Sequence, residues 1–137
     1  MSNIFVLDAC ALVALLRNEK GADKVAAVYD KAEKGEAQIF MNRVNLLEVF
    51  YGFYREDGKD YAEKIMDGVS KSIITIREFN KGLFNEAGRM KASYRISLAD
   101  SIALSQAIAL NAEFLTSDHH EFDALDGIEP VQFHFIR

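Results

Sequence analysis

The chain has 137 residues, of which 50% are hydrophobic and 27% are charged. A chain of this length and composition can bury a hydrophobic core, which excludes intrinsic disorder and predicts a single domain over residues 1–137. Its 16 Lys and Arg residues against 21 Asp and Glu residues give a formal net charge of −5. That balance argues against nucleic-acid binding through a basic patch alone.

Segments rich in β-branched and aromatic residues alternate along the chain with segments of helical periodicity. In chain order, they predict a strand at 3–7, helices at 11–16 and 23–34, a strand at 37–41, helices at 43–56 and 60–70, a strand at 72–77, helices at 80–94 and 98–110, and strands at 112–116 and 131–136. Asn42 and Ser97 are predicted N-caps, and Gly35 is predicted to end the helix before it.

Strands separated by helices indicate the α/β class. We expect a three-layer α/β/α sandwich, with a mostly parallel central sheet of four to five strands and helices on both faces. In such sheets, ligands bind beyond the carboxyl ends of the strands, at the point where the strand order reverses. Side chains that follow strands are therefore the first candidates for a site.

The single cysteine, Cys10, excludes an intrachain disulfide and a zinc site of several cysteines. It lies in an apolar run, where a free thiol usually behaves as a small buried hydrophobe. The N-terminal region lacks the basic segment of a signal peptide, and its apolar stretch is too short to span a bilayer. We expect a cytoplasmic protein with no membrane contact.

Four carboxylates occupy positions that predict a shared site. Asp8 follows the first predicted strand and Asp118 follows the fourth, so both belong to the carboxyl edge of the sheet. Glu48 and Asp100 interrupt the apolar faces of two predicted helices, where a buried charge is costly unless it is compensated. Taken singly, each acid has an ordinary alternative: Asp8 and Asp118 can cap helices, Asp100 can favour a helix N-terminus, and Glu48 can pair with an arginine.

Together, the four acids favour a metal site. Carboxylates that lie close together repel one another, and a divalent cation removes that repulsion. Carboxylate and water ligands suit Mg²⁺ or Mn²⁺, whereas zinc prefers nitrogen and sulfur ligands. We therefore predict a site for one or two such ions, which could activate water for attack on a phosphate.

Four segments of the sequence resemble the motifs of PIN-domain ribonucleases, most like the VapC-type toxins of toxin–antitoxin pairs. They are Val6–Leu12, Asn45–Val49, Leu98–Leu104, and Leu115–Asp118 followed by Phe122. The resemblance covers essentially the whole chain and implies a single PIN domain. It also implies an endoribonuclease that uses Mg²⁺ or Mn²⁺ and an activated water to hydrolyse phosphodiester bonds in transfer or ribosomal RNA.

The same resemblance assigns roles to individual residues. The catalytic acids of the family map to Asp8, Glu48, Asp100 and Asp118, and the metal ligands to Asp8, Asp100 and Asp118. Three further residues match supporting positions of the family: Asn45, Thr116 and Glu121. His119 and His120 are expected to be exposed loop residues, because carboxylates hold Mg²⁺ without imidazole.

The helix predicted at 43–56 is apolar nearly all round, so we expect burial on two sides. One side should pack on the sheet, and the other should meet either a second chain or only the helix at 60–70. The family resemblance implies a homodimer and a cognate antitoxin that blocks the site. Arg89, Lys91 and Arg95 precede the Asp100 helix and could steer an RNA backbone, or could simply form a solvated helix face.

Two alternatives to the nuclease remain. A receiver-like signalling domain also binds Mg²⁺, but it keeps its acids at strand ends, whereas Glu48 and Asp100 fall within predicted helices. A catalytically idle scaffold of the same fold would not need all four acids.

Overall fold

Five parallel strands form one sheet in the computed structural model, which describes residues 3–137. The strands are β1 (Ile4–Leu7), β2 (Gln38–Asn42), β3 (Ile74–Arg77), β4 (Glu113–Thr116) and β5 (Gln132–Phe135). All four neighbouring pairs are parallel. The predicted mostly parallel sheet of four to five strands is confirmed; Met1 and Ser2 of the predicted domain lie outside the described residues.

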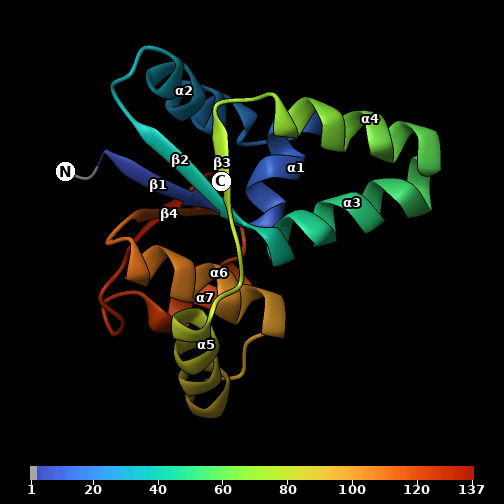
Figure 1. Cartoon of the computed structure of the whole chain (residues 1–137). Helices are drawn as coiled ribbons and strands as arrows, with labels where there is room; N and C mark the ends of the chain where they lie inside the picture. Colours follow the sequence, from blue (N-terminus) through green and yellow to red (C-terminus); the bar gives the residue numbers. More distant parts are fainter. Residues whose placement is uncertain (1–2) are drawn as a thin grey trace.

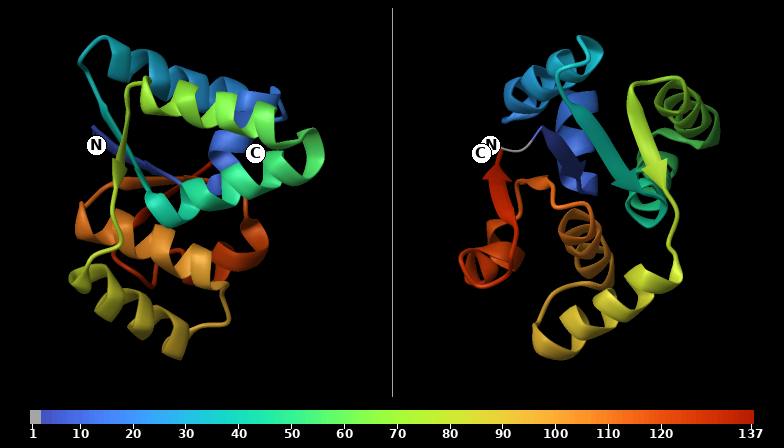
Figure 2. Two further views of the ribbon diagram at one scale, coloured as in Figure 1. Left: turned by 45° about the vertical axis from the view of Figure 1, so that its right-hand side comes forward. Right: turned by 60° about the vertical axis from the view of Figure 1, so that its left-hand side comes forward.

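Helices cover both faces of this sheet, as Figures 1 and 2 show. One layer holds α1 (Ala9–Arg17), α2 (Ala22–Glu33), α3 (Arg43–Asp57) and α4 (Lys59–Ser70). The other layer holds α5 (Lys81–Ser93), α6 (Leu98–Ala109), the short α7 (His119–Phe122) and the 3₁₀ turn η1 (Asp123–Leu125). The predicted three-layer α/β/α sandwich is therefore confirmed.

Side-chain alternation along the strands builds the two cores between these layers. Phe5 and Leu7 of β1 pack into the core beneath α1 to α4, while Val6 faces the core beneath α5 to α7. In β4, Leu115 joins the first core and Phe114 the second. The central strands are thus buried on both faces, which explains their nearly uninterrupted apolar sequence.

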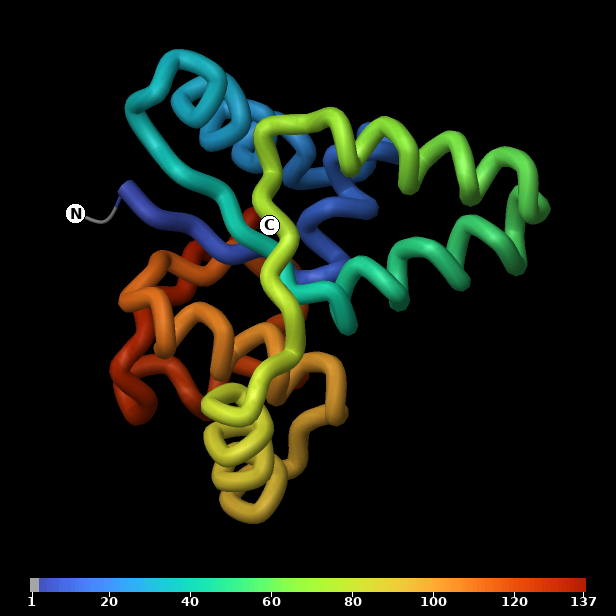
Figure 3. The backbone as a smooth tube through the Cα atoms, in the orientation of Figure 1, coloured from blue at the N-terminus to red at the C-terminus, as the bar shows by residue number. Residues whose placement is uncertain are grey.

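The chain moves from one helical layer to the other in the segment between β3 and α5 (Figure 3). This single change of face produces the strand order β3-β2-β1-β4-β5. The order reverses between β1 and β4, because α1 leaves β1 toward one layer and α7 leaves β4 toward the other. We call the space beyond the carboxyl ends of β1 and β4, where sheets of this topology bind ligands, the crevice. Receiver domains have the different order 2-1-3-4-5, so the receiver-like alternative loses its support.

Local signals in the sequence explain where most elements begin and end. The side chains of Asn42 and Ser97 accept hydrogen bonds from the first turns of α3 and α6, as predicted. Gly35 follows α2 with a φ of 77°, a left-handed conformation that favours glycine. The first helix begins at Ala9 rather than at the predicted position 11, because Asp8 caps it. The predicted elements did not include α7 and η1, because seven residues carry no helical periodicity, although Asp118 was considered as a helix cap and does cap α7.

Within residues 3–137, no helix is both long enough and apolar enough to cross a membrane.

Candidate active site

Asp8 lies at the reversal point of the sheet, directly after β1, and is only 1% exposed. Its Oδ1 accepts a hydrogen bond of 2.8 Å from the Ala11 N–H, which caps α1. Its Oδ2 accepts one of 2.5 Å from the hydroxyl of Thr116, the last residue of β4. Asp8 therefore serves both as a helix cap and as a wall of the crevice.

The electrostatic environment of Asp8 disfavours its charged form. Burial raises the pKa of its carboxyl to about 6, against the opposing hydrogen bonds from Thr116 and Ala11. The negative charges of Asp118 and Glu48 add to the increase. Because a pKa of about 6 is close to neutral pH, a cation bound nearby would favour the ionised form of Asp8.

Thr116 also orders Asp118. Its Oγ1 accepts a hydrogen bond of 3.0 Å from the Asp118 N–H while it donates to Asp8. The Asp118 carboxylate then accepts one of 3.0 Å from the Glu121 N–H and so caps α7. One hydroxyl thereby fixes the two segments that leave the central strands.

Asp100 is brought to the same crevice by the start of α6. The Ser97 hydroxyl accepts from the Asp100 N–H at 3.1 Å, and the Ser97 N–H donates to Oε1 of Glu121 at 3.0 Å. In a helix-capping box, the acid three residues after the cap accepts from the cap's own N–H. Here Glu121 of α7 takes that place.

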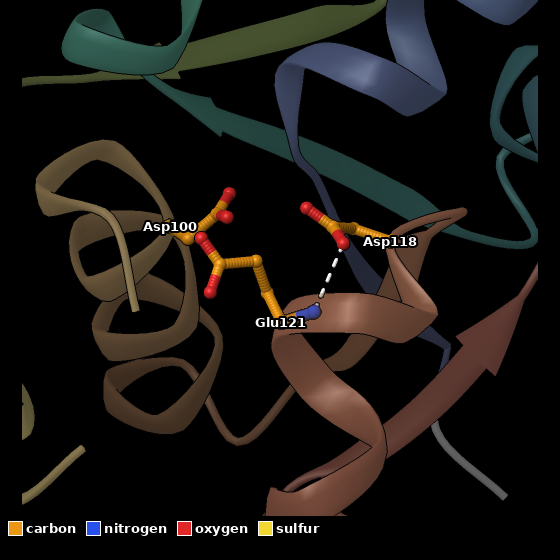
Figure 4. A group of neighbouring side chains, drawn as sticks. All are labelled: Asp100, Asp118 and Glu121. Carbon is orange, nitrogen blue, oxygen red and sulfur yellow. Dashed lines mark hydrogen bonds between the residues drawn. The ribbon is translucent and has the colours of Figure 1, made fainter. Parts of the chain in front are cut away.

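Asp100, Asp118 and Glu121 consequently form a compact acidic group. One carboxylate oxygen from each lies within 4.8 Å of the others, and the three side chains converge on one space (Figure 4). Burial raises the pKa of Asp100 to about 8, and the charges of Asp8, Asp118 and Glu121 contribute, while a hydrogen bond with Ser97 opposes the increase. The group bears a repulsion that a bound cation would relieve.

Glu48 and Asn45 form another side of the crevice, one helical turn apart on α3. Glu48 is half-buried, and this burial raises its pKa against a hydrogen bond with Asn45. The Asn45 Nδ2 donates to the Ala99 carbonyl at 2.9 Å, beside Asp100. Because a carbonyl cannot donate, this contact fixes the amide orientation. Asn45 Oδ1 is then a buried acceptor with no donor among residues 3–137.

Cys10 departs from its prediction, because the residue is exposed rather than buried. It is the second residue of α1 and lies close enough to the four predicted acids for their charges to act on its thiol. Partial desolvation of the thiol, together with the charges of the four predicted acids, raises its pKa to about 12. The thiol is therefore protonated at neutral pH and is a poor nucleophile.

The structure brings together the acids that the sequence singled out, but the compact group contains Glu121 in place of Asp8. Asp100 and Asp118 meet Glu121, which the sequence placed only in a supporting position. Asp8 lies beside this group, with each of its oxygens already accepting a hydrogen bond. The spacing of Glu121 from Asp118 favours a local contact with that cap, so the sequence carried no signal for its contact with Ser97.

The basic residues near α6 differ in their freedom to meet a phosphate. Arg89 pairs with Glu86 and with the nearly buried Glu129, and Lys91 donates to the Ile96 carbonyl. Arg95 is exposed and has no ion pair or hydrogen bond within the described part of the chain. Of the three, only Arg95 has a charged group that is not already bonded to another described residue and is therefore free to meet a phosphate.

The chemistry of the donor set fits a hard divalent cation. Asp100, Asp118 and Glu121 offer carboxylate oxygens, and Asn45 of α3 holds a buried amide oxygen that has no donor among residues 3–137. No cysteine or histidine belongs to the acidic group found among the described residues. Mg²⁺ and Mn²⁺ prefer such oxygen ligands, whereas structural zinc sites use nitrogen and sulfur.

Comparison with known proteins agrees with this geometry. The model of the family described as "PIN domain" matches residues 5–128. No curated protein matches the chain. Several solved structures of toxin–antitoxin proteins share its fold at low sequence identity.

Three of these structures illustrate the likeness. VapBC2 of Rickettsia felis, bound to a promoter DNA fragment, is 19% identical with a TM-score of 0.73, covering 96% of this chain and 98% of that one. DNA-bound VapBC of Salmonella typhimurium is 14% identical with a TM-score of 0.75, covering 100% of both chains. VapC20 of Mycobacterium tuberculosis, described as a toxin that cleaves the sarcin–ricin loop, is 14% identical with a TM-score of 0.66, covering 88% and 94%. At these identities the likeness establishes a shared fold.

Proposed function

The chain belongs to the PIN-domain family, and from this we propose that it is a metal-dependent endoribonuclease, the toxin of a toxin–antitoxin pair, in which residues 1–137 act as one PIN domain. The observation that carries the proposal is the acidic group of Asp100, Asp118 and Glu121 at the reversal point of the sheet. Family membership alone would not distinguish an active nuclease from an idle scaffold. The raised pKa values of Asp100 within this group and of Asp8 beside it favour the active form.

The acids would divide between metal binding and proton transfer. Asp100, Asp118 and Glu121, with Asp8 beside them, would hold one or two Mg²⁺ or Mn²⁺ ions. When bound, such an ion supplies Lewis acidity toward the phosphate and lowers the pKa of water. Glu48, whose pKa is raised by burial, is suited to accept a proton in the crevice. Thr116 would keep Asp8 and Asp118 in register.

RNA is the proposed substrate, with transfer or ribosomal RNA as the expected class. The description of VapC20 as a toxin that cleaves the sarcin–ricin loop supports this choice by analogy of fold. A net charge of −5 does not oppose it, because two bound divalent ions would bring the formal total from −5 to −5 + 4 = −1. The positive charge that attracts phosphate would then reside in the site itself.

We also propose a homodimer and a cognate antitoxin, both in the cytoplasm. One face of α3 is buried, but Leu47, Tyr51 and Tyr54 remain 54%, 44% and 45% exposed, so α4 does not cover the outer face. An apolar groove of about 610 Å³ lies between α3 and α4 and is lined by residues such as Phe50 and Met66. Apolar surface of this kind is typical of a protein that binds partners. The solved VapBC complexes support an antitoxin as one of them.

The proposal is tested by incubating the purified chain with folded transfer and ribosomal RNA, in Mg²⁺ and in excess EDTA. We expect discrete cleavage products in Mg²⁺ only, and none from Asp100→Asn with an unchanged circular dichroism spectrum. Asp30→Asn on α2, an exposed aspartate distant from the crevice in sequence, is the matched control and should cleave like wild type. Cleavage in EDTA, or full activity of Asp100→Asn, would contradict the assignment.

A further inference from the structure

His119 makes more contacts than an exposed loop histidine needs. It is the first residue of α7, and its Nδ1 lies 2.8 Å from Oδ1 of Asp123. Its Nε2 lies 2.7 Å from the backbone oxygen of Arg137, in the segment after β5. The imidazole also stacks on Phe135 of β5, with ring centroids 4.1 Å apart and planes 14° apart. Both ring nitrogens and one ring face are therefore engaged.

These contacts fasten a turn that has little stability of its own. The helix α7 has four residues, and an isolated helix of that length is not stable in water. Asp118 immediately precedes His119 and Glu121 follows it by two positions, and both belong to the acidic group. Repulsion from Asp100 acts on these two acids, so the turn needs an attachment on its far side. His119 supplies that attachment by tying the turn to the end of the chain beyond β5.

We propose that His119 is a positioning residue of the metal site, which holds the α7 turn against β5 so that Asp118 and Glu121 stay directed toward Asp100. The inference rests on the proposed metal-dependent function and adds to it a residue outside the acidic set. His119 does not itself touch the reacting groups, because both of its ring nitrogens are used elsewhere. Outer residues that orient metal ligands commonly change metal affinity by roughly 10–100-fold.

The neighbouring histidine provides a matched control. His120 is also exposed, lies in the same turn, and has no hydrogen bond or ion pair within the described residues. Mn²⁺ binding to purified His119→Ala, His119→Gln and His120→Ala is measured by isothermal titration calorimetry at a temperature where all variants are folded. We expect Mn²⁺ affinity to fall about tenfold or more in His119→Ala and to stay within about twofold of wild type in His120→Ala. His119→Gln keeps an N–H donor for the Arg137 oxygen and should recover part of the loss.

Other outcomes separate this inference from the proposed function. If His119→Ala lowers the melting temperature but binds Mn²⁺ like wild type, the residue is merely structural and the inference is wrong. If wild type itself binds no Mn²⁺, the proposed metal-dependent function fails, and the inference fails with it. If His119→Ala does not fold, Asp123→Ala replaces it, because this exposed partner can be removed without touching the core. Unchanged Mn²⁺ affinity in folded Asp123→Ala would then overturn the inference.

Discussion

The hydroxyl of Thr116 donates a hydrogen bond to the carboxylate of Asp8 across 108 residues of sequence, and thereby joins the ends of the two central strands. The same oxygen accepts from the Asp118 N–H. A single buried hydroxyl thus links the first and last of the predicted acids. The topology makes this possible, because β1 and β4 are neighbours at the point where strand order reverses.

Replacing Thr116 by valine should destabilise the protein, because Oδ2 of buried Asp8 loses its donor and the Asp118 N–H loses its acceptor. A buried polar group left without a partner costs about 1–3 kcal/mol. Thr116→Ser keeps the hydroxyl and should lose less. Urea denaturation followed by circular dichroism measures both variants, and equal stability of the valine and serine variants would show that the hydroxyl has no such role.

Stability without metal should decrease as pH rises. The carboxyls of Asp8 and Asp100 have folded-state pKa values of about 6 and about 8, raised from 3.8. From about pH 4 up to these raised values, the folded protein therefore binds more protons than the unfolded chain. Stability from these groups is complete below about pH 4 and is lost as pH rises through about 6 and about 8. In EDTA, the melting temperature at pH 5.5 should therefore exceed that at pH 8.5.

Added Mg²⁺ should oppose this decrease and raise the melting temperature more at pH 8.5 than at pH 5.5, because more of the carboxylates are ionised at the higher pH. His119, whose pKa is raised by Asp123 and the Arg137 carbonyl, contributes to the metal-free trend with the same sign. The difference between wild type and Asp100→Asn isolates the Asp100 part, and the variant should show a flatter pH profile. A melting temperature in EDTA that increases from pH 5.5 to pH 8.5 would contradict the assignment of raised pKa values.

Arg95→Glu should weaken RNA cleavage at low salt, by roughly threefold to tenfold in kcat/KM, because a glutamate repels the RNA phosphate that an arginine would neutralise. The salt dependence of the rate should become shallower for the same reason. Lys24→Glu makes the same charge change on α2, in the opposite helical layer, and is the control. Measuring the cleavage rate against salt concentration tests both. An identical loss in the two variants would indicate a net-charge effect and no specific role for Arg95.

Leu47→Glu combined with Tyr51→Glu should convert the proposed homodimer to a monomer, since both side chains are on the exposed face of α3. Light scattering after size-exclusion chromatography gives the mass directly. Ile128→Glu, at a position 67% exposed in the turn after η1, is the control and should leave the mass unchanged. A monomeric wild type would remove the homodimer from the account.

The sequence was informative where one residue type has one strong local preference. Asn42 and Ser97 were predictable as caps, and Asp8 and Asp118 were predictable at the sheet edge, because both acids directly follow buried strands of a parallel sheet. Both readings of Asp8 proved compatible, since it caps α1 and lines the crevice.

Other features depended on tertiary structure that no local pattern carries. Glu121 reaches Ser97 only because α7 and the start of α6 meet across the crevice. Cys10 is in an apolar segment but is exposed, and the charges of the four predicted acids act on it. His119 contacts Arg137 and Phe135 near the end of the chain in addition to the local Asp123. Each of these was set by contacts between segments distant in sequence.

The most direct test of the central claim measures Mn²⁺ binding and RNA cleavage together, on the same preparations of wild type and Asp100→Asn. The account predicts that cleavage by wild type is absent without metal and rises in parallel with occupancy of the site. It also predicts that Asp100→Asn loses both binding and cleavage while remaining folded. Cleavage that persists in excess EDTA, or in Asp100→Asn without bound Mn²⁺, would contradict the claim that this acidic group is the nuclease site.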